Sequence, residues 1–173
     1  MKKDNRSMGR LPEKNLGKRE RREDWQDKFL KEGKGMVMCK KCHDAREHKE
    51  WHAGTVAGVP AGVHLALCPA CTMIERGQYE GEILVSGVTP EKEGEFLNFL
   101  LAYGKRARTA NSQHRLIEIA KKGKGGYRIT TTENQLAPKL GKKIAETFKP
   151  ATHKVSFAEE PYKIAVVKVT LGA

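Results

Sequence analysis

Apolar and polar residues follow a pattern that predicts a strand and then a helix after residue 79. The segment Glu82–Ser86 has three consecutive apolar residues at its centre, two of them β-branched, which is typical of a strand. Thr89 and Pro90 follow as a helix N-cap and a first helical residue. Apolar residues beyond them recur at helical spacing and predict a buried helix face. They are Phe96, Phe99, Leu100 and Tyr103.

The next segment predicts a second helical piece. Asn111 and Ser112 can cap a helix whose apolar residues are Leu116, Ile117 and Ala120. Glycines from residue 123 onward then end this piece. We therefore expect two helical pieces before the chain returns to the sheet.

The chain after residue 126 predicts a strand, a helix and two closing strands. Tyr127–Thr131 is rich in β-branched residues, and Thr132–Gln135 fits a capping box that opens a helix. Pro138 fits poorly in a helix that begins at Thr132, so this helix either starts later or is kinked. Strands are expected around residues 154–158 and 163–171. The inner face of the helix is expected to carry Leu136, Leu140, Ile144 and Phe148.

These elements predict an α+β fold in which a small β-α-β-α-β-β layered sandwich has its helices on one face of the sheet. We assign the sandwich to residues 79–173. Ahead of it, Met36–Met38 and Val63–Leu67 each lead into a pair of cysteines, which predicts a zinc ribbon at residues 36–78. Residues 1–35 are rich in charged residues and poor in apolar ones, so we expect a mobile basic arm.

All four cysteines occur in two C-x-x-C pairs, Cys39 with Cys42 and Cys68 with Cys71, separated by residues 43–67. Each pair can direct two thiolates toward one ion, and two pairs supply the four sulfur ligands of a tetrahedral zinc site. Histidines in the insert could replace one cysteine, but four thiolates already complete the shell. Four thiolates also suit iron, so the predicted cofactor is zinc with iron left open.

Three other uses of the cysteines agree less well with the sequence. Disulfides need an oxidising compartment, whereas the N-terminus has no apolar stretch typical of an export signal, so we expect a cytoplasmic protein. Cys39–His43 matches the C-x-x-C-H haem-attachment string, which belongs to exported proteins and leaves the second pair unexplained. A thioredoxin-like dithiol needs one pair at a helix N-terminus after a strand, and neither pair is expected there.

Positive charge predicts a polyanionic partner. The formal net charge is +12, and residues 101–154 carry thirteen Lys and Arg against three Glu. Nucleic acid is the leading partner class for such a chain. No apolar run approaches the roughly 18 residues needed to span a bilayer, so no membrane partner is expected. Apart from the arm, the expected phosphate-binding residues are Lys105, Arg106, Arg108, Arg115, Lys121, Lys122, Lys124, Lys139, Lys142 and Lys143.

Several of these motifs together resemble a known family. Asp24–Lys28 at the end of the basic arm, the first C-x-x-C, the stretch Cys68–Gly81, and Ile129–Thr132 ahead of a helix carry the likeness. The chain resembles bacterial zinc-ribbon proteins related to the nonsense-mediated-decay protein that serves in eukaryotes as export adapter of the large ribosomal subunit. The likeness covers most of residues 22–171. Because those adapters have additional C-x-x-C pairs, the resemblance implies contact with the ribosome or RNA rather than the adapter role.

The sequence does not predict catalysis. It contains no G-x-S-x-G, no Walker loop and no H-E-x-x-H. A zinc ion held by four thiolates keeps no open position for water. We therefore expect a non-enzymatic RNA- or ribosome-binding protein without catalytic residues. The alternatives are an adaptor that binds a protein partner through the zinc ribbon and, less consistent with the sequence, an RNA-processing enzyme.

Overall fold

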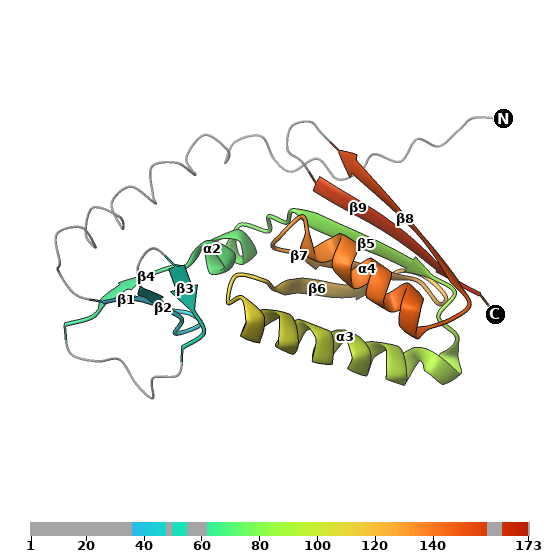
Figure 1. The fold of residues 1–173 in the computed structure, drawn as a ribbon, viewed down its shortest axis with the longest axis horizontal. Helices are drawn as coiled ribbons and strands as arrows, with labels where there is room; N and C mark the ends of the chain where they lie inside the picture. Colours follow the sequence, from blue (N-terminus) through green and yellow to red (C-terminus); the bar gives the residue numbers. More distant parts are fainter. Residues whose placement is uncertain (1–35, 48–49, 55–61, 159–163, 173) are drawn as a thin grey trace.

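The computed structural model describes residues 36–47, 50–54, 62–158 and 164–172 (Figure 1). The predicted basic arm at 1–35 lies outside the described residues. The described chain contains two sheets and the helices α2, α3 and α4, so the α+β class is confirmed. None of these helices combines the length and apolar character that a membrane-spanning helix needs.

The first sheet lies in the region predicted as a zinc ribbon. Its four strands run in the spatial order β3-β2-β1-β4. β1 pairs antiparallel with β2 and parallel with β4, which brings the ends of β1 and β4 together. The elements of this region are β1 (Val37–Cys39), β2 (Ala45–Glu47), β3 (Glu50–His52), β4 (His64–Ala66) and α2 (Pro69–Glu75).

The second sheet has five strands in the order β6-β7-β5-β9-β8. β5 lies at the centre, antiparallel to β7 and parallel to β9, while β6 and β8 form the two edges. Its elements are β5 (Gly81–Ser86), α3 (Pro90–Ala110), β6 (Leu116–Lys121), β7 (Tyr127–Thr131), α4 (Leu136–Thr147), β8 (Ala151–Ala158) and β9 (Ile164–Leu171).

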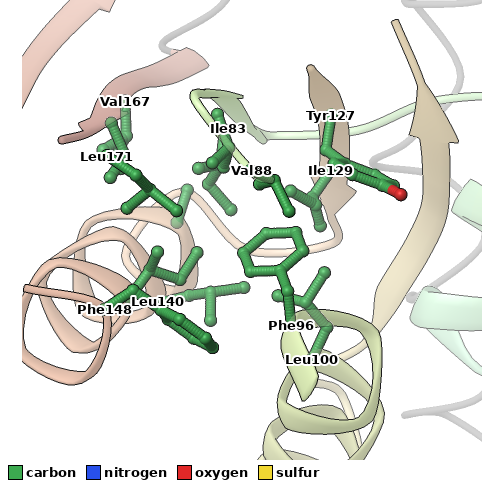
Figure 2. Close-up of a cluster of buried hydrophobic side chains, with 14 of the residues drawn as sticks. Ile83, Val88, Phe96, Leu100, Tyr127, Ile129, Leu140, Phe148, Val167 and Leu171 are labelled. Atoms are coloured by element: carbon green, nitrogen blue, oxygen red, sulfur yellow. The ribbon is translucent and has the colours of Figure 1, made fainter. Parts of the chain in front are cut away.

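Both long helices pack on the same face of the five-stranded sheet. Alternate residues of β5 and β9, such as Ile83 and Val167, point to this face and are fully buried. Phe96 of α3 meets them beside Leu140 of α4 and Phe148, which follows α4 (Figure 2). The rings of Phe96 and Phe148 lie 5.5 Å apart in an edge-to-face arrangement. The predicted layered sandwich with helices on one face is thus the observed arrangement.

The predicted second helical piece is wrong, because Leu116–Lys121 forms strand β6. A β-bulge between Leu116 and Glu118 inserts one extra residue, so Leu116 and Ile119 reach the core side although they are three residues apart. This spacing imitates a helix. Asn111 accepts a hydrogen bond from the backbone N–H of Gln113 and forms a turn instead of a helix cap. The element order is therefore β-α-β-β-α-β-β.

Helix α4 starts later than the Thr132–Gln135 capping-box motif indicates. Thr132 does not cap it: the Thr132 hydroxyl donates to the Gln113 carbonyl at 2.6 Å and accepts from the Arg115 N–H at 3.0 Å. α4 begins at Leu136, which places Pro138 in its first turn. The N–H groups of the first turn have no partner within the helix, so a proline is tolerated there. Of the two options for Pro138, the later start is confirmed.

Close packing of α4 against β9 predicts an unusual response to a glycine substitution. An alanine Cβ at Gly141 would lie 2.4 Å from Val167 Cγ1, whereas one at Gly94 in α3 would meet nothing within 4 Å. Gly141→Ala is expected to destabilise the protein by about 1–3 kcal/mol through overpacking. Gly94→Ala is expected to stabilise it by roughly 0.5–1 kcal/mol, the usual gain in a helix interior. Denaturant unfolding of both variants measures the difference, and equal effects would contradict this packing.

Candidate metal centre

The four cysteine side chains converge at one point. Their Sγ atoms all lie within 4.8 Å of one another, and the Sγ atoms of Cys42 and Cys68 are 3.7 Å apart. Around a tetrahedral ion with bonds of about 2.3 Å, neighbouring sulfurs are about 3.8 Å apart. The four thiols are therefore placed to hold one metal ion after a small contraction. As a donor set they suit zinc or iron.

The local backbone explains why the two pairs meet. Cys39 ends β1, and the parallel pairing of β1 with β4 sets it opposite Ala66, two residues before Cys68. Cys68 is the N-cap of α2, and its sulfur accepts the N–H of Cys71 at 3.4 Å. The N–H of Cys68 in turn donates to the Cys39 sulfur at 3.4 Å. These N–H groups stabilise negative charge on the sulfurs.

The second pair does lie at a helix N-terminus after a strand, contrary to the expectation that neither pair would. The other two sulfurs nevertheless share the same site, so the four thiols form one cluster rather than an isolated dithiol. Trp51 and Leu67 pack against the cluster, and three of the four cysteines are buried. The site is consequently screened from water.

Crowding couples the ionisation of the thiols. Hydrogen bonds from the Cys42 and Cys68 thiols lower the pKa of Cys39, while the hydrogen bond to Cys39 raises the pKa of Cys68. Burial raises the pKa of the Cys71 thiol to about 12. Ionising one thiol thus disfavours ionisation of its neighbours in this dry site. A bound cation removes that conflict, which is what a four-thiolate metal site requires.

A buried carboxylate lies directly beside the cysteine cluster. Asp44 is fully buried, and its carboxylate accepts from Arg115 at 2.6 Å and from Arg108 at 3.3 Å. The backbone N–H of Gly54 donates to the same carboxylate at 3.3 Å. The Asp44 charge is therefore compensated by two guanidinium groups and one backbone donor, which offsets the cost of burying it.

Arg115 joins this carboxylate to the cluster. Its guanidinium donates to the Cys42 sulfur at 3.5 Å as well as to Asp44. Burial disfavours the charged form of Arg115, but the hydrogen bond to Cys42 and the charge of Asp44 outweigh burial and raise the pKa of Arg115. Arg115 thus stays charged while only 11% of its side chain is exposed. Through its contact with Cys42, Arg115 places a positive charge beside the thiol cluster.

The turn between α3 and β6 holds the cysteine region against the five-stranded sheet. The Ser112 hydroxyl donates to the Trp51 carbonyl at 2.6 Å, and the N–H of Ala70 donates to the Gln113 side-chain oxygen at 3.0 Å. Sequence reasoning missed this junction. Asp44 follows the first C-x-x-C closely, but no local signal links it to Arg115, from which it is separated by 71 positions.

Comparison with known proteins does not identify a family. No protein-family model matches the chain. No similar sequence was found among curated proteins. The likeness to the ribosome-export adapter family therefore stays a prediction drawn from motifs. What the structure does support is the geometry: four thiols that could hold a metal ion, set against a basic α+β sandwich.

The predicted phosphate-binding residues fall into three places rather than one. Lys105, Arg106 and Arg108 lie on the second half of α3, and Arg108 and Arg115 are both bound to Asp44. Lys121, Lys122 and Lys124 lie at or after the end of β6, where Lys121 pairs with Glu93 at 2.5 Å. Lys139, Lys142 and Lys143 lie together on the exposed side of α4, the last two beside Glu146.

Proposed function

We propose that this protein is a non-enzymatic, zinc-stabilised protein that binds RNA or the ribosome. The observation that carries the proposal is a four-thiol metal centre held against a sandwich whose exposed helices and loops carry an excess of lysine and arginine. The metal centre supplies structure, and the positive charge supplies the contacts. The resemblance to ribosome-associated zinc-ribbon proteins points in the same direction.

The donor set suits a structural zinc ion better than a catalytic one. Cys39, Cys42, Cys68 and Cys71 fill all four positions of a tetrahedral ion, and catalytic zinc sites leave one position open for water or substrate. When bound, zinc would hold the two C-x-x-C turns in place. It would thereby also position Asp44, which contacts Arg108 and Arg115. No step of chemistry is assigned to the ion. Its role in the proposal is to fold residues 36–78.

Charge favours RNA over a neutral partner. The formal net charge of +12 exceeds what solubility requires, and exposed lysines can neutralise backbone phosphates. Arg108 and Arg115 are engaged by Asp44, so in this proposal they anchor the metal centre. The α4 lysines are the best placed for phosphates, because one carboxylate, Glu146, is shared between two of them.

RNA affinity is expected to fall steeply with salt. A surface that engages about five phosphates gives a slope of log affinity against log salt near −3 to −4, on a single-strand coefficient of about 0.7 per contact.

Reversing Lys139, Lys142 and Lys143 to Glu is expected to abolish co-sedimentation with ribosomes or RNA. The fold should survive, because these exposed ion pairs contribute little to stability.

The charge-preserving variant with arginine at the same three positions is the matched control. It is expected to co-sediment as the wild type does, at low and at high salt. Unchanged association of the glutamate variant at two salt concentrations would contradict the RNA proposal and favour a protein-binding adaptor. RNA cleavage or modification by the purified protein would instead favour the enzyme alternative. The cytoplasmic location stays a prediction.

A further inference from the structure

The two faces of the five-stranded sheet differ in what covers them. α3 and α4 both pack on the face formed by Ile83, Val167 and their neighbours (Figure 1). No helix in the described part of the chain covers the opposite face. Besides the apolar Ala158, Ile164 and the buried Val166, the open face over β8, β9 and the end of β5 carries six exposed polar side chains. They are Ser86, Thr152, Lys154, Ser156, Lys168 and Thr170.

Strand register sets two lysines side by side on this open face. Lys154 of β8 lies directly opposite Lys168 of β9 in the antiparallel pairing. Directly opposed residues have Cβ atoms about 4.5–5.5 Å apart, and like charges at that separation destabilise a sheet. Exposed like charges this close repel each other, so the pair makes a small unfavourable contribution to the stability of the sheet.

Neither lysine has an acidic partner within the described residues, in contrast to the other half of the same face. There Arg128 pairs with Glu82 at 2.5 Å and with Glu118 at 3.3 Å, and it lies over the ring of Tyr79. The Arg128 charge is thus balanced inside the protein. No acidic residue of the described ranges balances the lysine pair, which leaves its charge available to an external anion.

Hydroxyl groups surround the lysine pair. Thr152 lies opposite Thr170 in the next same-face row, and the Ser86 hydroxyl donates to the Thr170 hydroxyl at 3.4 Å. Ser156 lies on the other side of the lysine pair along β8. The Ser156 hydroxyl donates to the Val166 carbonyl at 3.2 Å, which leaves the Thr152 and Thr170 hydroxyls as donors beside the two ammonium groups. Ammonium groups and hydroxyl donors suit phosphate oxygens.

We infer that the open face of the sheet, centred on Lys154 and Lys168, is a second phosphate-binding surface that engages the RNA backbone. The inference rests on the proposed function, whose main contacts lie on α4 across the sheet. A bound phosphate would relieve the repulsion between the two lysines. Neither the six polar residues nor their apolar neighbours Ala158, Ile164 and Val166 include an aromatic side chain, so bases have no stacking platform here and binding is independent of sequence.

The test measures binding of the full chain, loaded with zinc, to a fluorescent single-stranded oligouridine. Lys154→Gln with Lys168→Gln removes two phosphate contacts, so the salt slope should decrease in magnitude by about 1.4. The same coefficient gives a roughly 25-fold loss of affinity at about 0.1 M salt. Lys92→Gln with Lys149→Gln is the matched control, since it removes two exposed lysines outside both surfaces and should change binding much less.

A second variant separates binding from folding. Lys168→Glu places an acid opposite Lys154 and converts the like-charge pair into an opposite-charge pair. Its Tm is expected to equal or exceed that of the wild type while its affinity for oligouridine falls. A merely structural role for Lys168 would not produce that combination.

The outcomes distinguish this inference from the function on which it rests. If the wild type binds oligouridine and the glutamine pair binds with the same affinity and slope, the open face is not a binding surface, although the RNA proposal stands. If the wild type shows no salt-dependent binding, both proposals fail. A reduced slope in the glutamine pair, with the control unchanged, supports the open face as a phosphate-binding surface.

Discussion

Replacing Cys42 with alanine is expected to release the metal ion and to unfold residues 36–75. Apparent binding free energies of structural zinc are about 10–16 kcal/mol, which is comparable to the whole stability of a domain. The strands of this region are three residues long, and three of the four buried residues of its side-chain cluster are cysteines of the site. Elemental analysis should find one zinc per wild-type chain and none in the variant.

Hydrogen exchange locates the effect. Amide protection is expected to disappear from β1, β4 and α2 but to persist in β5, β7 and β9, which have their own apolar core. Cys42→His is the matched control, because an imidazole can still ligate zinc. A wild-type protein that is free of metal and melts identically with and without chelator would overturn the metal assignment. A sample that contains iron would instead identify iron as the bound metal.

Replacing Asp44 with alanine is expected to destabilise the protein by about 3–5 kcal/mol. Breaking a buried ion pair leaves the partner charge uncompensated, and Arg115 is the partner that would remain with little access to water. Arg108 is 42% exposed and can turn toward solvent, so its contribution to the loss should be smaller. Denaturant unfolding followed by far-UV circular dichroism measures the change.

Two further variants test the reason for that loss. Glu75→Ala removes an exposed ion pair with Lys41 near the same centre and is expected to cost less than about 1 kcal/mol. Adding Arg115→Met to Asp44→Ala should recover part of the stability, because the orphaned charge is then absent. If Asp44→Ala costs no more than Glu75→Ala, the buried network is not an energetic link between the metal centre and the sheet.

Local patterns in the sequence were sufficient for most of the sandwich. Short apolar runs, helix-capping residues and apolar periodicity predict β5, α3, β7 and the two closing strands. Each of these signals spans only a few neighbouring residues. β6 was missed because its bulge replaces the two-residue period of a strand with a helical spacing. The bulge forms because β6 pairs with β7 while Leu116 and Ile119 both pack on the core. Both contacts belong to the tertiary structure and leave no local signal in the sequence.

The sequence by itself was sufficient to predict the four thiols that could hold a metal ion, because a C-x-x-C pair places two sulfurs by local turn geometry and two pairs complete one shell. Only the tertiary structure decided which charges are free. Arg108 and Arg115 look like phosphate-binding residues in the sequence, yet both are bound to Asp44, which lies 64 and 71 positions away along the chain. Lys154 and Lys168 look unremarkable, yet register sets them opposite each other. Electrostatic energy depends on distance in space, and spacing along the chain does not determine that distance between residues of different elements.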